Sequence, residues 1–409
     1  MKRRVVITSM GVISSLGHQR GEIIQSLKEG KVNFARPVFD NDVVTAPVAN
    51  FNIRDHTGRF KDGRYLSRGA KFAVAAAMAA IKCSGYKKED LAEAGLFVGT
   101  GPNLDIGGEF PDIHGGNIDR KDLQALWILK FLPNTAASII AKLAGIHGEN
   151  LTVSTACSAS LQAIGEAFRK IKAGYLDLAI AGGGDSRLSP GGILAYKKAG
   201  ALYAGNSDPQ KASQPFDCNR RGFVPGEGGA FFLLEELERA KKRGAHIYGE
   251  ICGYASSLDA YNMTAPEREG KWGRIAVLSA LREAEMSPSQ IDVISTHGTG
   301  TFLNDAREAD LIGDIYAGCS PRVMALKSWI GHTASACGTL ELAISLICMQ
   351  ENYLPEIRNL QEPCHKEINF VREGRSFSFG ACTIENFGFG GQNSVLVVKR
   401  SNDLCSTEL

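Results

Sequence analysis

The chain has 409 residues, ten of them cysteines, and a formal net charge of +2. This length allows two domains or one large unit with an ample core. The small net charge gives no reason to expect nucleic acid or a membrane surface as a partner. No apolar run reaches the roughly 18 residues of a membrane-spanning helix, and the absence of a C-x-x-C pair argues against zinc and against a disulfide framework. We therefore expect a soluble, cytoplasmic protein.

The first half of the chain alternates between strand and helix patterns. The N-terminal segment is basic and then apolar, but its serines and glycines and its alternating pattern indicate a core strand, not a signal peptide. The predicted elements are a strand at 5–7, helices at 20–29 and 64–84, a strand at 96–101, a helix at 136–144, and strands at 151–153, 178–184 and 230–234. Residues 102–132 have mixed patterning and resemble an insertion.

The second half repeats this layout. It contains a helix at 274–285, strands at 291–295 and 323–326, an apolar helix at 340–349 and a final strand at 395–398. Strands that alternate with helices favour an α/β fold in which helices cover mainly parallel sheets. We predict two similar halves, residues 1–248 and 249–409, related by a pseudo-two-fold axis. Equivalent turns of both halves would then meet at the strand ends.

Cys157 stands where a strand gives way to a helix. Residues 151–153 favour a strand, and apolar residues recur at helical spacing from Leu161 onward. At a helix start, the helix dipole and unpaired backbone N–H groups favour thiolate over thiol. Most cysteines are simply buried, so this position alone does not decide between a structural and a reactive thiol.

Two further turns carry chemistry-bearing residues. His297 lies in the glycine turn THGTGT, and Lys327 and His332 lie in KSWIGH between a strand and a helix. Strand-end turns are where a rigid scaffold presents functional side chains. A buried lysine needs a carboxylate partner, and we predict Glu308, which shares a helix face with Asp305.

A glycine-rich segment, NFGFGGQN at residues 386–393, precedes the final strand. Its glycines permit backbone conformations that other residues avoid. Two interpretations stay open on physical grounds. The segment is an ordinary loop, or it is a wall of the site that offers a backbone N–H to a developing oxyanion.

Four motifs together resemble the β-ketoacyl-[acyl-carrier-protein] synthases, the elongating condensing enzymes of type II fatty acid and polyketide synthesis. They are VSTACSAS, THGTGT, KSWIGH and NFGFGGQN, in this order. The segments PFDCNRRGFVPGEGGAFFLLEELERAKKRGA and LDAYNMTAP extend the resemblance over nearly the whole chain. The resemblance implies the thiolase fold, which is a five-layered αβαβα unit of two duplicated halves and is normally dimeric.

The resemblance also implies a reaction and its residues. Cys157 would take the acyl chain from the phosphopantetheine thioester of an acyl carrier protein. His297 and His332 would complete a Cys-His-His triad and hold the malonyl thioester carbonyl during decarboxylation. Lys327, with Glu308, would keep the charges and hydrogen bonds of the site in order.

The same resemblance gives Phe389 two roles. Its backbone N–H, with that of Cys157, would form the oxyanion hole, and its ring would gate the acyl pocket. No cofactor and no metal are expected, because the substrates arrive on phosphopantetheine.

Expected partners follow from the acidity of carrier proteins. A basic docking patch is expected near the tunnel mouth, and Arg64, Arg68 and Lys71 would share a helix face there. An ordinary solvated helix face is the alternative. A homodimer is expected, and a heterodimer with a chain-length-factor homologue is a second arrangement.

Two other functions compete with an active ketosynthase. A non-catalytic chain-length factor resembles synthases but usually lacks the nucleophilic cysteine, and a degradative thiolase uses coenzyme A thioesters and a second catalytic cysteine. Gln392, Phe302 and Asn262 depart from the usual family residues, and the 102–132 segment fits the family poorly. Acyl chain length and pathway therefore stay open.

Overall fold

The computed structural model describes residues 3–104, 125–205 and 208–401. Within these residues, ten strands form one hydrogen-bonded sheet in the order β3-β2-β4-β5-β1-β6-β12-β11-β7-β8. The first half supplies β1 (Val5–Ile13), β2 (Gly95–Gly99), β3 (Asn150–Val153), β4 (Leu178–Ser186) and β5 (Glu227–Glu236). The second half supplies β6 (Gly249–Leu258), β7 (Val293–Ser295), β8 (Arg322–Met324), β11 (Ala381–Gly388) and β12 (Gln392–Lys399). A separate two-stranded sheet joins β9 (Tyr353–Leu354) to β10 (Arg375–Ser376).

The strand order repeats between the halves. Read outward from the centre, the first half runs β1-β5-β4-β2-β3 and the second runs β6-β12-β11-β7-β8. In each half the two inner pairings are antiparallel and the two outer pairings are parallel. The halves meet where β1 pairs with β6, beginning at Val5 opposite Ile251. This repeat confirms the predicted duplication.

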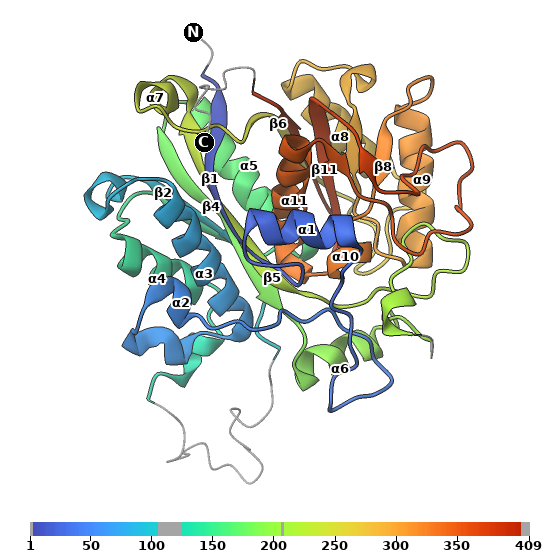
Figure 1. The fold of residues 1–409 in the computed structure, drawn as a ribbon, viewed down its shortest axis with the longest axis horizontal. Coiled ribbons are helices and arrows are strands. Elements are labelled where there is room, and N and C mark those ends of the chain that lie inside the picture. The colour runs from blue at the N-terminus through green and yellow to red at the C-terminus, as the bar shows by residue number, and fades with distance from the viewer. Residues whose placement is uncertain (1–2, 105–124, 206–207, 402–409) are drawn as a thin grey trace.

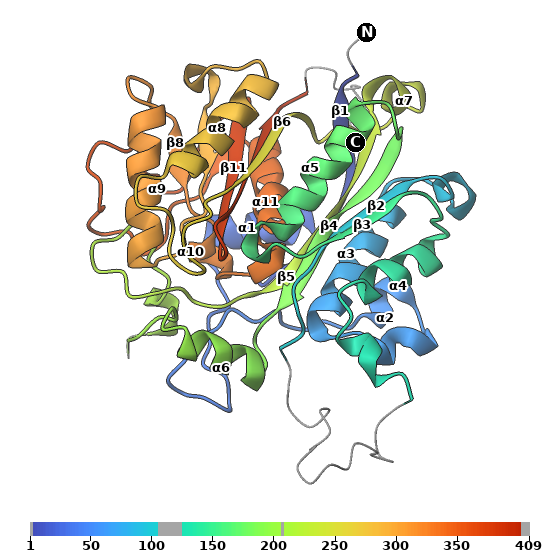
Figure 2. The same ribbon diagram turned by 180° about the vertical axis from the view of Figure 1, so that it is seen from behind.

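Helices and sheet halves form five layers (Figures 1 and 2). The helices are α1 (Arg20–Glu29), α2 (Arg54–Thr57), α3 (Arg68–Cys83), α4 (Thr135–Ala144), α5 (Ala159–Lys172), α6 (Pro190–Lys198), α7 (Leu237–Lys242), α8 (Lys271–Glu283), α9 (Phe302–Ile315), α10 (Lys327–Ile330) and α11 (Cys337–Glu351). Helices α5 and α11 pack against each other and contact strands of both halves. Helix α3 covers the outer face of the first half with α4, and α8 covers that of the second half with α9.

Helix α11 lies at the centre of the molecule. Every residue from Cys337 to Met349 is buried, because α11 contacts α5 on one side and strands of both halves on others. A helix covered all round needs mostly apolar residues all round, which accounts for the largely apolar pattern of this segment. No helix among the described residues is long and apolar enough to cross a membrane.

Several predicted boundaries change. The helix predicted at 64–84 begins at Arg68, because the Ser67 hydroxyl caps it by accepting the Ala70 N–H (3.2 Å). Residues Lys61–Tyr65 form a separate short 3₁₀ helix. The strand β11 was not predicted, since the polar Glu385 and Asn386 interrupt its apolar pattern although both are buried. Strand β6 was also missed. Most of the atypical segment 102–132 lies outside the described residues.

Candidate active site

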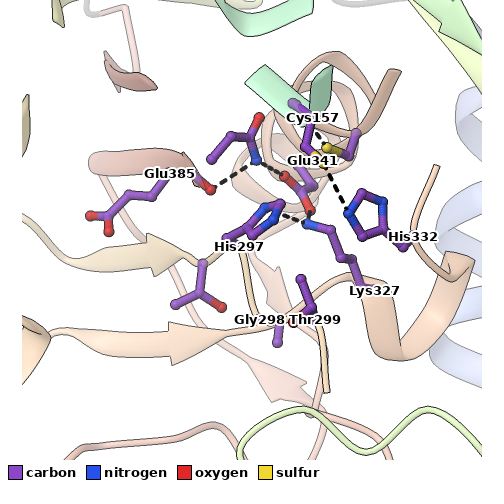
Figure 3. A network of polar contacts seen from close by, with 12 residues as sticks. Cys157, His297, Gly298, Thr299, Lys327, His332, Glu341 and Glu385 are labelled. Atoms are coloured by element: carbon purple, nitrogen blue, oxygen red, sulfur yellow. Dashed lines mark hydrogen bonds and ion pairs between the residues drawn. The ribbon is translucent and has the colours of Figure 1, made fainter. Parts of the chain in front are cut away.

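Three strand-end turns bring Cys157, His297 and His332 together (Figure 3). Cys157 lies in a short 3₁₀ turn between β3 and α5, His297 follows β7, and His332 follows α10 in the connection after β8. The Cys157 Sγ and one ring nitrogen of each histidine all lie within 4.8 Å of one another. The two halves thus contribute to one site at the strand ends, as the predicted duplication requires.

The chain bends sharply at the nucleophile. Ala156 has φ +49°, a left-handed conformation that non-glycine residues seldom adopt, and this turns Cys157 toward the histidines. The Cys157 Sγ lies 3.3 Å from His332 Nε2. Burial raises the pKa of the Cys157 thiol, although Lys327 and the Phe389 N–H oppose this shift. Burial therefore opposes the helix-start effect that the sequence predicts for this thiol.

His332 is a neutral hydrogen-bond donor. Its Nδ1 accepts the Ala334 N–H at 3.0 Å, so the ring hydrogen is on Nε2, the atom that faces Cys157. Burial lowers the pKa of His332 to about 3, and the charge on Lys327 adds to this. A ring with so low a pKa stays uncharged at any ordinary working pH.

His297 is also a neutral hydrogen-bond donor, and Lys327 determines which ring nitrogen carries the hydrogen. Lys327 Nζ lies 3.1 Å from His297 Nδ1, and an ammonium can only donate, so Nδ1 accepts and Nε2 carries the hydrogen. Burial lowers the pKa of His297 well below its usual value, with further contributions from Lys327 and His332. The two rings stand nearly perpendicular, with centroids 5.4 Å apart. The site therefore holds two neutral N–H donors.

The carboxylate partner of Lys327 is Glu341, not the predicted Glu308. Lys327 Nζ lies 2.5 Å from Glu341 Oε1, and Glu341 Oε2 accepts from Asn386 Nδ2 at 2.7 Å (Figure 3). Burial acts to lower the pKa of Lys327, but Glu341, together with Cys337 and Glu308, outweighs it and the pKa is raised, so the lysine stays charged. Sequence reasoning missed Glu341, although one acidic residue inside an otherwise apolar helix was a signal that could have found it.

Glu308 holds the loop that carries His297. Its Oε1 accepts the His297 N–H at 2.6 Å and its Oε2 accepts the Gly298 N–H at 2.8 Å. Asp305 accepts the N–H groups of Thr299 and Gly300 in the same way. Burial raises the pKa of Glu308, and Glu385 adds to the shift. Both acids of α9 therefore position the turn backbone, and neither contacts Lys327.

The glycine-rich turn lies against the nucleophile. A Cβ at Gly388 would meet the Cys157 nitrogen at 3.1 Å, so the turn comes close only because it has no side chain there. Phe389 follows, with 39% of its surface exposed, and its backbone N–H acts to lower the pKa of the Cys157 thiol. Of the two interpretations left open by the sequence, the structure favours a wall of the site over an ordinary loop.

A cavity of about 600 Å³ contains the site. Its lining includes Cys157, His297, His332 and Phe389. This volume is within the usual range of small-molecule sites, about 300–1,000 Å³. A long, flexible substrate arm therefore has room to reach the thiol.

The three clustered atoms are also spaced as metal ligands would be. The donor set fits a metal poorly, because the charged Lys327 ammonium lies 3.1 Å from His297 and would repel a cation. The Lys327–Glu341 pair instead suits a site that must keep two imidazoles neutral.

The predicted docking residues do not share one helix face. Arg64 lies in the 3₁₀ helix before α3 and stacks on the ring of Tyr65 at 4.8 Å. Arg68 begins α3, but its guanidinium donates to both oxygens of the buried Glu227 (2.6 and 2.7 Å). Burial lowers the pKa of Lys71, and the charges of Arg68 and Lys130 add to this. Basic residues do gather here, but Arg68 is neutralised by its partner.

Comparison with known proteins agrees with this geometry. Residues 2–240 match the β-ketoacyl synthase N-terminal domain and residues 248–361 match its C-terminal domain. The 3-oxoacyl-[acyl-carrier-protein] synthase 2 of Coxiella burnetii is 34% identical, over 98% of this chain and 100% of its own.

Two solved structures are similarly close. The ishigamide ketosynthase/chain length factor has a TM-score of 0.88 at 29% identity, covering 98% of this chain and 100% of that one. A type II polyketide ketosynthase, in complex with its acyl-carrier protein and bound to a hexaketide, has a TM-score of 0.87 at 28% identity, with the same coverage. The domain models match most of the chain, one relative of full length is 34% identical, and the structural neighbours have the thiolase fold. This chain therefore belongs to the β-ketoacyl synthase family of condensing acyltransferases.

Proposed function

We propose that this protein is an active β-ketoacyl-[acyl-carrier-protein] synthase that joins an acyl chain on Cys157 to a malonyl extender. One observation carries the proposal: two neutral imidazole N–H donors lie beside a thiol, and a paired lysine keeps one of them in its donating tautomer. Such donors stabilise charge that develops on an oxygen without binding a carboxylate permanently.

Acyl transfer is the first step. The Cys157 sulfur attacks the carbonyl carbon of an acyl thioester, and the negative charge on that oxygen is stabilised by the N–H groups of Cys157 and Phe389. The tetrahedral intermediate collapses, the bond to the pantetheine sulfur breaks, and that sulfur takes the proton that Cys157 gave up. The acyl chain is then a thioester on Cys157.

Decarboxylation and condensation follow. The malonyl thioester loses carbon dioxide, and the electron pair moves to its carbonyl oxygen as an enolate that the Nε2–H groups of His297 and His332 hold. The enolate carbon attacks the acyl carbon on Cys157, the Cys157 sulfur leaves with the bonding pair, and a proton from solvent restores the thiol. The product is a β-ketoacyl thioester two carbons longer, and no cofactor of the protein is used.

Mass spectrometry tests this function and its competitors together. The purified protein is incubated with acyl- and malonyl-carrier protein, and also with the coenzyme A thioesters. We expect acylated Cys157 and a β-ketoacyl-carrier product. A chain-length factor would show no acylation, and a thiolase would turn over coenzyme A thioesters alone. Cys157→Ala is the control, since it keeps the histidines but removes the nucleophile.

We also propose that two chains pair through β3. This strand is at the edge of the sheet, and its Leu151 is 42% exposed. An exposed edge strand presents unpaired backbone groups and invites pairing with another strand. The second chain would be a copy of this one, or a chain-length-factor homologue as in the ishigamide pair. Leu151→Lys with Thr152→Pro should shift the mass measured by light scattering to that of a monomer, and an unchanged mass would contradict this interface.

The nine described cysteines are all free. Free thiols persist in reducing compartments, and Cys157 must stay reduced to react, so we propose a cytoplasmic setting. Because the proposed reaction uses carrier-bound thioesters, we also propose an acyl carrier protein as the partner that delivers both substrates.

A further inference from the structure

One part of the cavity wall is polar, and its charged residue is buried. Arg187 lies just after β4 with 5% of its surface exposed, and Tyr196 lies on α6 (Figure 2). Both line the cavity that contains Cys157. The catalytic scheme above uses neither residue.

Two chains of contacts connect this wall to the active site. The Phe223 ring lies 5.0 Å from the His332 ring and 5.0 Å from the Tyr196 ring. On the other side, Arg187 pairs with Asp185, which accepts the Ser335 N–H at 3.1 Å. Ser335 directly follows Ala334, whose N–H binds His332. A chain bound to Cys157 that enters this part of the cavity therefore meets Arg187 and Tyr196.

Arg187 and Tyr196 each have hydrogen-bond donors without a partner among the described residues. A guanidinium carries five N–H groups. Those of Arg187 make three hydrogen bonds, two to Asp185 Oδ2 (2.9 and 3.3 Å) and one to the Pro102 carbonyl, which leaves two N–H groups without a partner among the described residues. The Tyr196 hydroxyl likewise has no hydrogen-bond partner in the described part of the chain. Burial raises the pKa of Tyr196, so this hydroxyl stays protonated.

The charge of the wall further limits the class of ligand that it can bind. Because Asp185 balances Arg187 at 2.9 Å, the wall is close to neutral and does not select for a carboxylate. A saturated chain would displace water from these donors and leave them unsatisfied, which is unfavourable. An uncharged oxygen acceptor would satisfy them.

We propose that the acyl chain held on Cys157 carries an uncharged oxygen function, a keto or hydroxyl group, and that Arg187 and Tyr196 bind it. Arg187 and Tyr196 thereby determine acyl specificity. This inference rests on the proposed ketosynthase function and names its substrate class.

Matched acyl chains test the inference. Octanoyl-carrier protein is compared with 3-, 5- and 7-oxooctanoyl-carrier proteins, and the rate of Cys157 acylation is followed by intact-protein mass spectrometry. We expect at least one oxo chain to acylate Cys157 about tenfold faster than octanoyl, the position of its oxygen reporting the reach of the wall. Equal or faster acylation by octanoyl would overturn the inference.

Two variants connect the preference to these residues. Tyr196→Phe removes one hydroxyl and should reduce the preference for the oxo chain over octanoyl several-fold. Tyr175→Phe, the same change at a tyrosine that is 75% exposed and outside the cavity lining, should leave it unchanged. Asp185→Asn combined with Arg187→Leu removes both charges together and should abolish the preference. If the double variant fails to fold, Tyr196→Phe still decides, and an unchanged preference there overturns the inference.

The two proposals fail differently. Absence of acylation with every chain, octanoyl included, would contradict the ketosynthase function itself. Acylation by all chains at one rate would leave that function standing and remove only the oxygen preference.

Discussion

Lys327 connects the two requirements of the site, charge balance and tautomer choice. It donates to His297 Nδ1 and pairs with Glu341, both in the buried interior. Burying one charge without a partner is costly, and removing one member of such a pair is strongly destabilising. Glu341 therefore lets Lys327 stay charged where it must act, and Lys327 in turn keeps His297 an N–H donor.

The histidines should matter for decarboxylation and not for acylation. Removing one oxyanion donor typically lowers the rate by about 100- to 1,000-fold. His297→Ala and His332→Ala should each lose malonyl decarboxylation by a factor of this order, measured as labelled carbon dioxide release, while Cys157 is still acylated. Normal decarboxylation in either variant would show that its ring does not hold the enolate.

The buried neutral state of His332 predicts a pH dependence of stability. In the unfolded chain a histidine takes up a proton near pH 6.5, whereas native His332 has a pKa of about 3. Below pH 6.5 the unfolded state thus binds more protons, and stability falls as the pH falls, by about 1.4 kcal/mol per pH unit from this residue.

Urea denaturation at pH 7, 6 and 5 measures this slope. In His332→Asn the slope between pH 6 and 5 should be smaller by about 1.2 kcal/mol per unit, slightly below the limiting value because the unfolded histidine is not yet fully protonated at pH 6. His147→Asn, which changes a histidine outside the cavity lining, is the matched control. An identical slope in His332→Asn and the native protein would mean that His332 is charged in the folded state.

At the scale of elements, the duplication extends to backbone strain. Ala156 before α5 and Ala334 before α11 both have φ +49°, at equivalent places in the two halves. Each follows an outer parallel strand and precedes a helix of the central layer. The first half uses its bend to present Cys157, and the second half uses its bend to hold His332 through the Ala334 N–H. One turn geometry thus supplies the nucleophile and orients one of its two histidines.

Substitution by glycine should cost less stability at Ala334, in the bend before α11, than at the neighbouring Ala336. A left-handed conformation costs a non-glycine residue about 1–2 kcal/mol, whereas Ala336, at φ −92°, has no such strain. Both substitutions remove one buried methyl group. Ala334→Gly should therefore destabilise the protein by about 1–2 kcal/mol less than Ala336→Gly, measured by urea denaturation. Equal losses would contradict strain at this turn.

For the whole molecule, docking of a charged partner depends on local surface charge and not on the net charge of the chain. The net charge is only +2, yet basic residues gather at the start of α3. Lys71 is close enough to Arg68 and Lys130 for their charges to lower its pKa, and Arg64 lies in the short helix just before α3. A local patch suffices to orient an acidic partner, because electrostatic complementarity mainly affects encounter and orientation.

Arg64 and Arg68 should therefore respond differently to substitution. Arg64→Glu should raise the carrier concentration needed for half-maximal turnover and reduce its salt dependence, with stability unchanged. Arg68→Gln should instead lower stability by about 2 kcal/mol, because it takes charged hydrogen bonds from the buried Glu227. Steady-state kinetics at two salt concentrations and urea denaturation distinguish the two. Unaltered carrier dependence in Arg64→Glu would exclude this residue from docking.

Local patterns in the sequence determined much of this protein. Apolar periodicity located most strands and helices, since burial of one face needs only neighbouring residues to have the right spacing. The duplicated order of elements predicted that Cys157, His297 and His332 would meet, and four motifs identified their family.

Tertiary structure alone decided what surrounds these residues. Glu341, and not Glu308, pairs with Lys327, because α11 passes through the centre of the molecule and places a residue 14 positions along the chain beside the ammonium. The strand β11 escaped prediction because it buries polar side chains, and one of them, Asn386, donates to Glu341, a residue distant in sequence. Burial raised the pKa of Cys157 and gave Arg187 its place in the cavity wall. Glu341 did leave a local signal, as the one acidic residue in the apolar part of α11, but its partner did not. The partners and the pKa shifts depend on which segments pack together, and desolvation and long-range pairing leave no local pattern from which to predict them.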